Sequence, residues 1–160
     1  MAALTSSRNT PEMGDGGRMR VYPVEANTNI YLGSIVALNA AGNAVPASAT
    51  TDSANTLKAI GRAERVQDGI PGADAINNPG AAGAISIVVR KGVFLYAQDS
   101  SIAQAQLGAT CFALDDNNVT ATDRGTGASV QQYAAVGEAV ALDPSGQVWV
   151  DFWHQATPTA

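Results

Sequence analysis

The chain is poor in the residues that most often carry chemistry, because its 160 residues include one cysteine, one histidine and two lysines. Cys111 alone cannot form an intramolecular disulfide, and its apolar surroundings predict a small buried side chain rather than a reactive thiol. His154 stands near the C-terminal end, where we do not expect a rigidly held general base. One histidine and one cysteine also exclude the usual zinc ligand sets within a single chain.

Long apolar runs are missing as well. None approaches the ~20 residues that span a membrane. The first seven residues have neither the basic nor the apolar part of a signal peptide. We therefore expect a soluble protein that is made in the cytoplasm and has no membrane partner.

Charge is scarce and unevenly placed. Charged residues make up 14% of the chain, and the net charge is −5. From Gln98 onward there are seven acidic residues and one basic residue, Arg124. Nucleic-acid binding needs many phosphate-neutralising side chains, so nucleic acid is excluded as a partner. A weakly charged surface rich in glycine and alanine suits contacts with other protein subunits.

No motif of a cofactor or catalytic site is found. The glycine-rich stretches 14–17 and 125–127 do not stand between a strand and a helix, as a phosphate-binding loop requires. Residues 115–118 (Asp-Asp-Asn-Asn) lack the spacing, glycine and distal glutamate of a calcium loop, and predict a solvated β-turn. We therefore expect no enzymatic activity, no cofactor and no metal site.

One stretch of sequence occurs twice. Residues 32–39 (Leu-Gly-Ser-Ile-Val-Ala-Leu-Asn) return as residues 107–115 (Leu-Gly-Ala-Thr-Cys-Phe-Ala-Leu-Asp), with one extra residue. Downstream, Ala-Ile-Gly-Arg-Ala at 59–63 is matched by Ala-Val-Gly-Glu-Ala at 135–139. An apolar strand, a turn and a second strand with a central glycine are thus used twice. The repeat predicts a compact β scaffold and favours a structural role.

Apolar stretches that alternate or are β-branched predict eight to ten strands. These are residues 21–24, 30–38, 44–47, 57–66, 84–91, 93–97, 107–115, 119–122, 133–142 and 147–152. Gly92 interrupts the clearest run and predicts a bulge or tight bend. Residues 100–108 predict one short helix, and residues 67–83 predict a long surface loop. The expected fold class is all-β, a small barrel or sandwich with an internal pseudo-repeat.

The first twenty residues lack periodicity and contain four closely spaced glycines and prolines of the kind that disfavour regular structure. They predict an extended N-terminal arm (1–20), before a single β domain (21–153) and a C-terminal tail (154–160). The arm is either a free tail or a segment that orders on a neighbouring subunit. The second alternative would use Arg8, Met13, Arg18, Met19 and Arg20 for docking.

Aromatic side chains near both ends complete the candidate interaction residues. Tyr22 stands in a predicted edge strand, and Trp149 and Trp153 share one face of the last strand by alternation. The two tryptophans could stack on a sugar ring, or fill a core or subunit interface. The predicted interface residues are Arg8, Met13, Arg18, Met19, Arg20, Tyr22, Trp149 and Trp153.

Residues 33–47, followed by Ile-Gly-Arg-Ala at 60–63, resemble the capsid decoration (cement) proteins of tailed bacteriophages, and so do residues 84–94. In that family a glycine precedes the first apolar strand, an Ala-Gly turn and an Ala-Val-Pro return follow, and a later strand carries an internal glycine. The resemblance covers residues 20–97, and reaches 105–152 through the repeat. The chain departs from the shorter members by its second copy and its long N-terminal segment.

The resemblance implies a β protein on the outside of the virion, which bridges major capsid protein subunits and stabilises the expanded head. It also implies a homo-oligomer, a trimer or dimer, at capsomer junctions. A carbohydrate-binding adhesion module on the head surface is the alternative, with Trp149 and Trp153 gripping the glycan.

Overall fold

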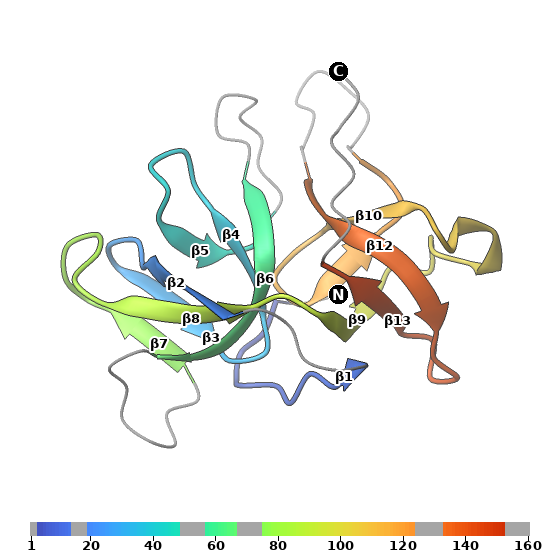
Figure 1. The fold of residues 1–160 in the computed structure, drawn as a ribbon, viewed down its shortest axis with the longest axis horizontal. Coiled ribbons are helices and arrows are strands. Elements are labelled where there is room, and N and C mark those ends of the chain that lie inside the picture. The colour runs from blue at the N-terminus through green and yellow to red at the C-terminus, as the bar shows by residue number, and fades with distance from the viewer. Residues whose placement is uncertain (1–2, 14–18, 49–56, 67–74, 124–132, 153–160) are drawn as a thin grey trace.

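Two small β-barrels lie side by side in this protein (Figure 1). The computed structural model describes residues 3–13, 19–48, 57–66, 75–123 and 133–152, whose regular secondary structure is almost entirely β-strand. Barrel 1 runs from blue to green in the figure and barrel 2 from yellow to red. The predicted all-β class with a small barrel is confirmed.

Barrel 1 closes through a single bridge. Its strands pair antiparallel in the order β2-β8-β6-β4-β5, and a parallel bridge between Val24 and Ala44 joins the two ends of this sheet. A separate two-stranded sheet, β3-β7, contributes Ile30 and Ile76 to the same apolar interior. The bounds are β2 (Met19–Pro23), β3 (Thr28–Tyr31), β4 (Ile35–Leu38), β5 (Ala44–Pro46), β6 (Lys58–Val66), β7 (Ala75–Asn78) and β8 (Ser86–Arg90).

Barrel 2 closes by regular pairing. Its strands follow the order β9-β11-β10-β12-β13, and β13 pairs with β9 to complete the ring. The β9–β11 pair is parallel, and the short strand β1 adds to the start of β9. The bounds are β1 (Glu12–Met13), β9 (Val93–Gln98), β10 (Thr110–Ala113), β11 (Asn118–Thr120), β12 (Ala134–Leu142) and β13 (Val148–Asp151).

The two barrels have the same topology. Strands β2, β4, β5, β6 and β8 pair with one another as β9, β10, β11, β12 and β13 do, and the closing Val24–Ala44 bridge corresponds to the Gln98–Val119 pair. Even single hydrogen bonds recur. The Gly33 amide donates to the Ala63 carbonyl (2.9 Å), as the Gly108 amide donates to the Ala139 carbonyl (2.8 Å). The predicted sequence repeat is therefore a repeat of whole barrels.

A glycine at the centre of the long strand is required in each barrel. A Cβ atom on Gly137 would lie 2.0 Å from the Asp151 carbonyl oxygen, and one on Gly61 would lie 2.5 Å from the Arg90 carbonyl oxygen. Both distances are far below van der Waals contact, so strands β12 and β6 can cross β13 and β8 only with glycine at these positions. This close approach explains why the two sequence copies share that glycine.

Three local predictions were wrong or incomplete. Residues 30–38 form two strands, because Gly33 takes a φ of +88° and turns the chain between β3 and β4. The predicted loop 67–83 contains β7, which finds its partner β3 about fifty residues earlier in the chain. The predicted helix at 100–108 is only a 3₁₀ turn at Gln104–Gln106, since Ser100 has a φ of 70° and cannot begin a helix.

Gly92 does mark a break, as predicted. It separates β8 of barrel 1 from β9 of barrel 2, and its carbonyl accepts a hydrogen bond from the Phe152 amide (3.0 Å). The bend therefore lies at the point where the chain passes from one barrel to the other.

The reactivity of the Cys111 thiol can test whether barrel 2 is closed. Its side chain is buried in the barrel core, and this burial raises the pKa of the thiol to about 12. We expect the native protein at pH 8 to be inert towards a thiol-exchange reagent, and the protein unfolded in guanidinium to react at once. The absorbance of the released thiolate measures both rates. Rapid reaction of the native protein would contradict a closed barrel.

Candidate interaction surface

The two barrels meet through a strand that is buried on both faces. In β4, Val36 points into the core of barrel 1, while Ile35 and Ala37 join the apolar cluster of barrel 2. The Ile35 amide also donates to the Asp116 carbonyl, over 2.7 Å. This double burial makes the two barrels one packed body. β4 is apolar throughout, as expected for a strand with no solvent face.

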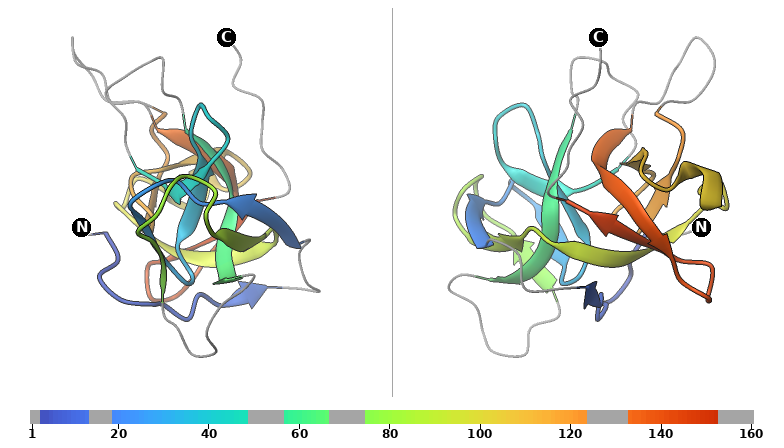
Figure 2. Two further views of the ribbon diagram at one scale, coloured as in Figure 1. Left: turned by 90° about the vertical axis from the view of Figure 1, so that its left-hand side faces the viewer. Right: turned by 45° about the vertical axis from the view of Figure 1, so that its right-hand side comes forward.

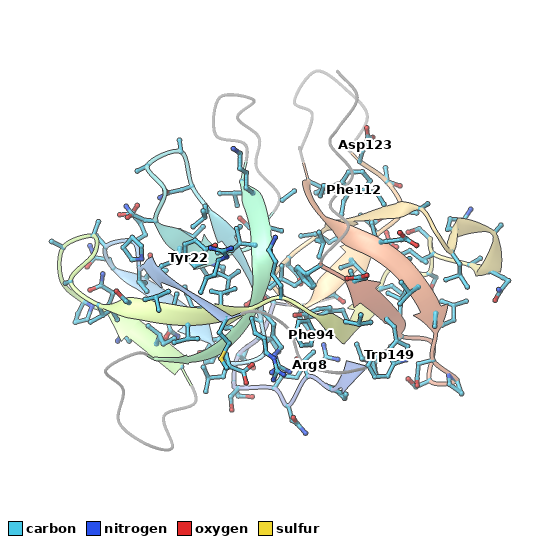
Figure 3. All side chains as sticks on the ribbon, viewed as in Figure 1. Arg8, Tyr22, Phe94, Phe112, Asp123 and Trp149 are labelled. Carbon is cyan, nitrogen blue, oxygen red and sulfur yellow. The ribbon has the colours of Figure 1, made fainter. Side chains whose placement is uncertain are left out.

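Aromatic and cationic side chains seal one side of this junction. The Arg62 guanidinium lies over the Phe94 ring, 4.5 Å from its centroid, and contacts Glu64. The Tyr96 hydroxyl reaches the Gly33 carbonyl at 3.4 Å, and burial raises the pKa of this phenol. Cation–π contacts of this kind are strongest where water is excluded. Figure 3 shows Phe94 and Arg8 together between the barrels.

Residues 3–13, here called the N-terminal strap, cross the junction and bind both barrels. On barrel 1, the Arg8 amide donates to the Leu32 carbonyl (3.0 Å) and the Thr10 hydroxyl to the Gly33 carbonyl (2.8 Å). On barrel 2, the Arg8 guanidinium donates to the Leu95 carbonyl (2.9 Å). β1 then pairs with β9. The described part of the predicted arm therefore lies against its own chain.

Burial changes the pKa of one group in the strap and of one group that the strap contacts. Burial lowers the pKa of the Arg8 guanidinium from its ordinary value, although this side chain stays far from neutral. Burial also raises the pKa of the Asp116 carboxyl, which accepts a hydrogen bond from the Leu4 amide (3.1 Å). The end of the strap is thus held by a carboxylate that has lost most of its water.

The structure divides the predicted interface residues into three groups. Arg8 is half-buried inside the junction. Trp149 is half-buried on β13 of barrel 2, where it pairs with Leu95 of β9. Met19, Arg20 and Tyr22 lie together on β2 of barrel 1, apart from Trp149 (Figure 3). Arg18 and Trp153 lie outside the described residues, and Met13 is placed only by its backbone in β1. His154, which was not predicted as an interface residue, also lies outside the described residues.

The outer face of β2 is the most exposed apolar surface in the described part of the chain. Met19 is 56% exposed and Val21 is 50% exposed, and they are the exposed large hydrophobic side chains within the described ranges. They are two residues apart and so share one face of the strand. Tyr22, on the other face, packs against the core of barrel 1. Figure 2 shows β2 at the outside of its barrel.

The edge of β2 corresponds to an edge of β9 in barrel 2. Residues 19–21 correspond to residues 93–95 of β9 by their pairing with β8 and β13. At β9, the strap adds β1, and the Leu95 amide donates to the Pro11 carbonyl (3.2 Å). At β2, no strand pairs with this edge among the residues that the structure describes. Within the described residues, barrel 1 therefore has an unpaired strand edge where barrel 2 has a paired one.

Sequence reasoning missed the residues that join the barrels. The sequence predicts a strand at Arg62 and Phe94 and a turn at Asp116, but nothing in their local pattern indicates that a second barrel covers them. Residues 115–118 form the predicted turn, in which Asp115 accepts hydrogen bonds from the Asn117 and Asn118 amides. The expectation that this turn is solvated was wrong, because Asp116 and Asn118 are buried. The one available signal was the uninterrupted apolar stretch of β4, which indicates burial on two faces.

Comparisons with known proteins found no matching family model, no matching curated protein and no matching solved structure. In the described parts of the chain, no three histidine, cysteine or acidic side chains come together as a possible metal site. Those same parts hold no helix with the length and hydropathy needed to cross a membrane.

The contact of the strap can be measured with a matched pair of glycine variants. Gly33 and Gly108 occupy equivalent turns with φ of +88° and +85°. A Cβ on Gly33 would lie 2.1 Å from the Arg8 carbonyl oxygen, whereas nothing lies within 4 Å at Gly108. We expect Gly108→Ala to lower the free energy of unfolding by about 1–2 kcal/mol. We expect Gly33→Ala to lower it by roughly 3 kcal/mol or more, because it also displaces the strap.

Urea unfolding measures both effects, and tryptic cleavage after Arg8 reports release of the strap. Cleavage should become faster in Gly33→Ala and stay unchanged in Gly108→Ala. Equal losses of stability in the two variants would contradict a bound strap.

The raised pKa of Asp116 predicts that the free energy of unfolding depends on pH. Its pKa in the folded protein is raised, so the folded state keeps a proton that the unfolded chain releases. The stabilisation by the protonated group is complete below the ordinary pKa of about 3.9 and is lost as pH rises through the folded-state pKa. We expect Asp116→Asn to be more stable than the natural protein at pH 7, with this advantage vanishing at pH 3. Urea unfolding at both values measures it, and a gain that is equal at the two pH values refutes the assignment.

Proposed function

We propose that this protein decorates the outside of a tailed-phage capsid and stabilises it by bridging subunits of the major capsid protein. The single observation that carries the proposal is the outer face of β2, where Met19 and Val21 are about half exposed on a strand edge that no described strand pairs with. Exposed apolar side chains on such an edge favour a protein partner. The resemblance of residues 33–47, 60–63 and 84–94 to decoration proteins supports the same role.

Strand addition is the mode of binding that the fold supports best. The strap already adds β1 to β9, so the equivalent edge at β2 has the geometry to receive an extended segment of the coat protein. Backbone hydrogen bonds would supply affinity, and Met19 and Val21 would supply apolar contact area. A single short strand binds weakly, but the same contact repeated over an icosahedral lattice gives high overall occupancy.

The rest of the molecule suits this role. Residues 93–152 carry seven acidic residues and one basic residue, so barrel 2 is acidic, whereas the described basic residues gather on the strap and barrel 1. A protein with one acidic barrel can turn it away from a shell packed with nucleic acid and keep the barrel whose net charge is close to zero towards the coat. The doubled barrel also gives a rigid span between neighbouring coat subunits. The protein would be made in the host cytoplasm and act on the virion without enzymatic activity.

Binding to bare heads tests the proposal. We expect purified protein to sediment with expanded heads of the virus that carries its gene, and to saturate at a fixed ratio to the coat protein. The decorated heads should withstand higher temperature and osmotic shock. The double variant Met19→Lys, Val21→Lys should reduce occupancy at least tenfold, because two charges replace the exposed apolar face.

A matched control has the same added charge elsewhere on barrel 1. Asn29 and Asn77 are exposed and lie opposite each other on β3 and β7, so the variant Asn29→Lys, Asn77→Lys should bind heads normally. Natural protein that remains in the supernatant at all concentrations would eliminate the proposed function.

A further inference from the structure

Each of the two surfaces that form the junction between the barrels has a more exposed counterpart on the other barrel. Three contacts define the junction itself: Ile35 amide to Asp116 carbonyl (2.7 Å), Tyr96 hydroxyl to Gly33 carbonyl (3.4 Å), and the Arg62 guanidinium over the Phe94 ring (4.5 Å). Barrel 1 supplies Gly33, Ile35 and Arg62, and barrel 2 supplies Phe94, Tyr96 and Asp116. Because the barrels are copies, each side of this junction also exists on the other barrel.

Strand register identifies the counterparts on barrel 2. Ile35 pairs with Arg62 across β4 and β6, and Thr110 pairs with Glu138 across β10 and β12. Gly33 and Gly108 have the same φ and the same hydrogen bond to the facing strand. The barrel 2 counterparts of Gly33, Ile35 and Arg62 are therefore Gly108, Thr110 and Glu138.

The same register identifies the counterparts on barrel 1. Arg20 and Tyr22 pair with β8 as Phe94 and Tyr96 pair with β13. The turn after β4 is closed by a bond from the Asn39 amide to the Asn43 carbonyl, as the turn after β10 is closed from Leu114 to Asn118. This places Ala41 at the position of Asp116. The barrel 1 counterparts of Phe94, Tyr96 and Asp116 are therefore Arg20, Tyr22 and Ala41.

Five of the six counterparts are more exposed than the originals, and Glu138 is half-buried as Arg62 is. Gly33 is buried, but Gly108 is exposed and has no atom within 4 Å of its Cβ position. Arg20 and Ala41 are exposed as well. The apolar face of barrel 1 at the junction follows the same rule. Its buried residues Ile35, Ala37, Ala47 and Ala59 correspond to Thr110, Phe112, Thr122 and Ala135, each of which is half-buried or exposed.

The chemistry of the two more exposed surfaces is complementary. The Arg62–Phe94 contact of the junction becomes a pairing of Glu138 with Arg20, an anion with a cation. Glu138 lies directly opposite Asp151 on β13, as Arg62 lies opposite Arg90 in barrel 1. The two barrels therefore carry opposite charges at these equivalent positions. Tyr22 has the hydroxyl that Tyr96 uses on Gly33, and can donate it to Gly108.

We propose that barrel 2 of one copy of this chain binds barrel 1 of a second copy, head to tail, by repeating the junction within the chain. In this contact, Tyr22 of one copy binds Gly108 of the next. Ala41 binds Thr110, and Arg20 binds Glu138. Such a contact joins two different surfaces and closes into a ring when the rotation between copies allows it. The inference goes beyond capsid decoration and does not depend on it. Met19 and Val21 lie on the opposite face of β2 from Arg20 and stay available for the coat protein.

Charge reversal tests the assignment. Sedimentation velocity of the natural full-length protein over a range of concentrations should show self-association that weakens at high salt. Arg20→Glu and Glu138→Arg should each weaken it at least tenfold. Lys58→Glu reverses the charge of an exposed residue on β6 outside the proposed contact, and should leave it unchanged. Circular dichroism and thermal unfolding check that each variant folds.

Restoring self-association with a second charge reversal distinguishes this contact from a general effect of charge. The double variant Arg20→Glu, Glu138→Arg should associate again, and so should an equimolar mixture of the two single variants, in which each copy meets an opposite charge at both ends. A natural protein that is monomeric at every concentration overturns the proposal. So do single variants that associate normally, and variants that neither the double substitution nor mixing restores.

The outcome is separable from capsid binding. Self-association is measured without heads, so its absence leaves the decoration proposal standing. If Arg20→Glu lowers occupancy on heads but does not change self-association, the inner face of β2 belongs to the coat protein and the head-to-tail contact is refuted.

Discussion

The burial of β4 between two barrels is the constraint on which the rest of this structure depends. A strand with one apolar face belongs to one barrel, but β4 presents Val36 to its own core and Ile35 and Ala37 to the next. Removing that second face from water holds the barrels together, at roughly 25 cal/mol for each Å² of apolar surface buried. The strap then lies over the seam, and Arg62 on Phe94 excludes water from its side.

Duplication explains both the regularity and the asymmetry of the molecule. The two barrels keep the same strand order, the same closing pair and the same central glycine, because each of these is demanded by the backbone alone. Their side chains have diverged where the surroundings differ. Arg62 and Arg90 lie beside each other in barrel 1, whereas Glu138 and Asp151 take those positions in barrel 2. One architecture thus carries two surfaces of opposite charge.

This asymmetry supports the two contacts that we propose. A symmetric pair of barrels would cover or expose the same surfaces on both, and could offer only one kind of contact. Here β9 is covered by the strap and by barrel 1, while its counterpart β2 has an apolar outer face and a cationic inner one. Two faces of one strand can therefore meet two different neighbours. That arrangement is compatible with the proposed coat-protein contact and the proposed contact between copies.

The sequence by itself determined the strands, the repeat and the class of fold, because alternation, turn residues and the recurring glycine are local signals. It located β5, β6, β8 and β12 closely. Only the tertiary structure decided that the repeat forms two barrels, that β7 pairs with β3, and that Arg8 seals a seam within the chain. Each of these depends on which segments meet across large separations in sequence, and no local pattern encodes which surface will cover another.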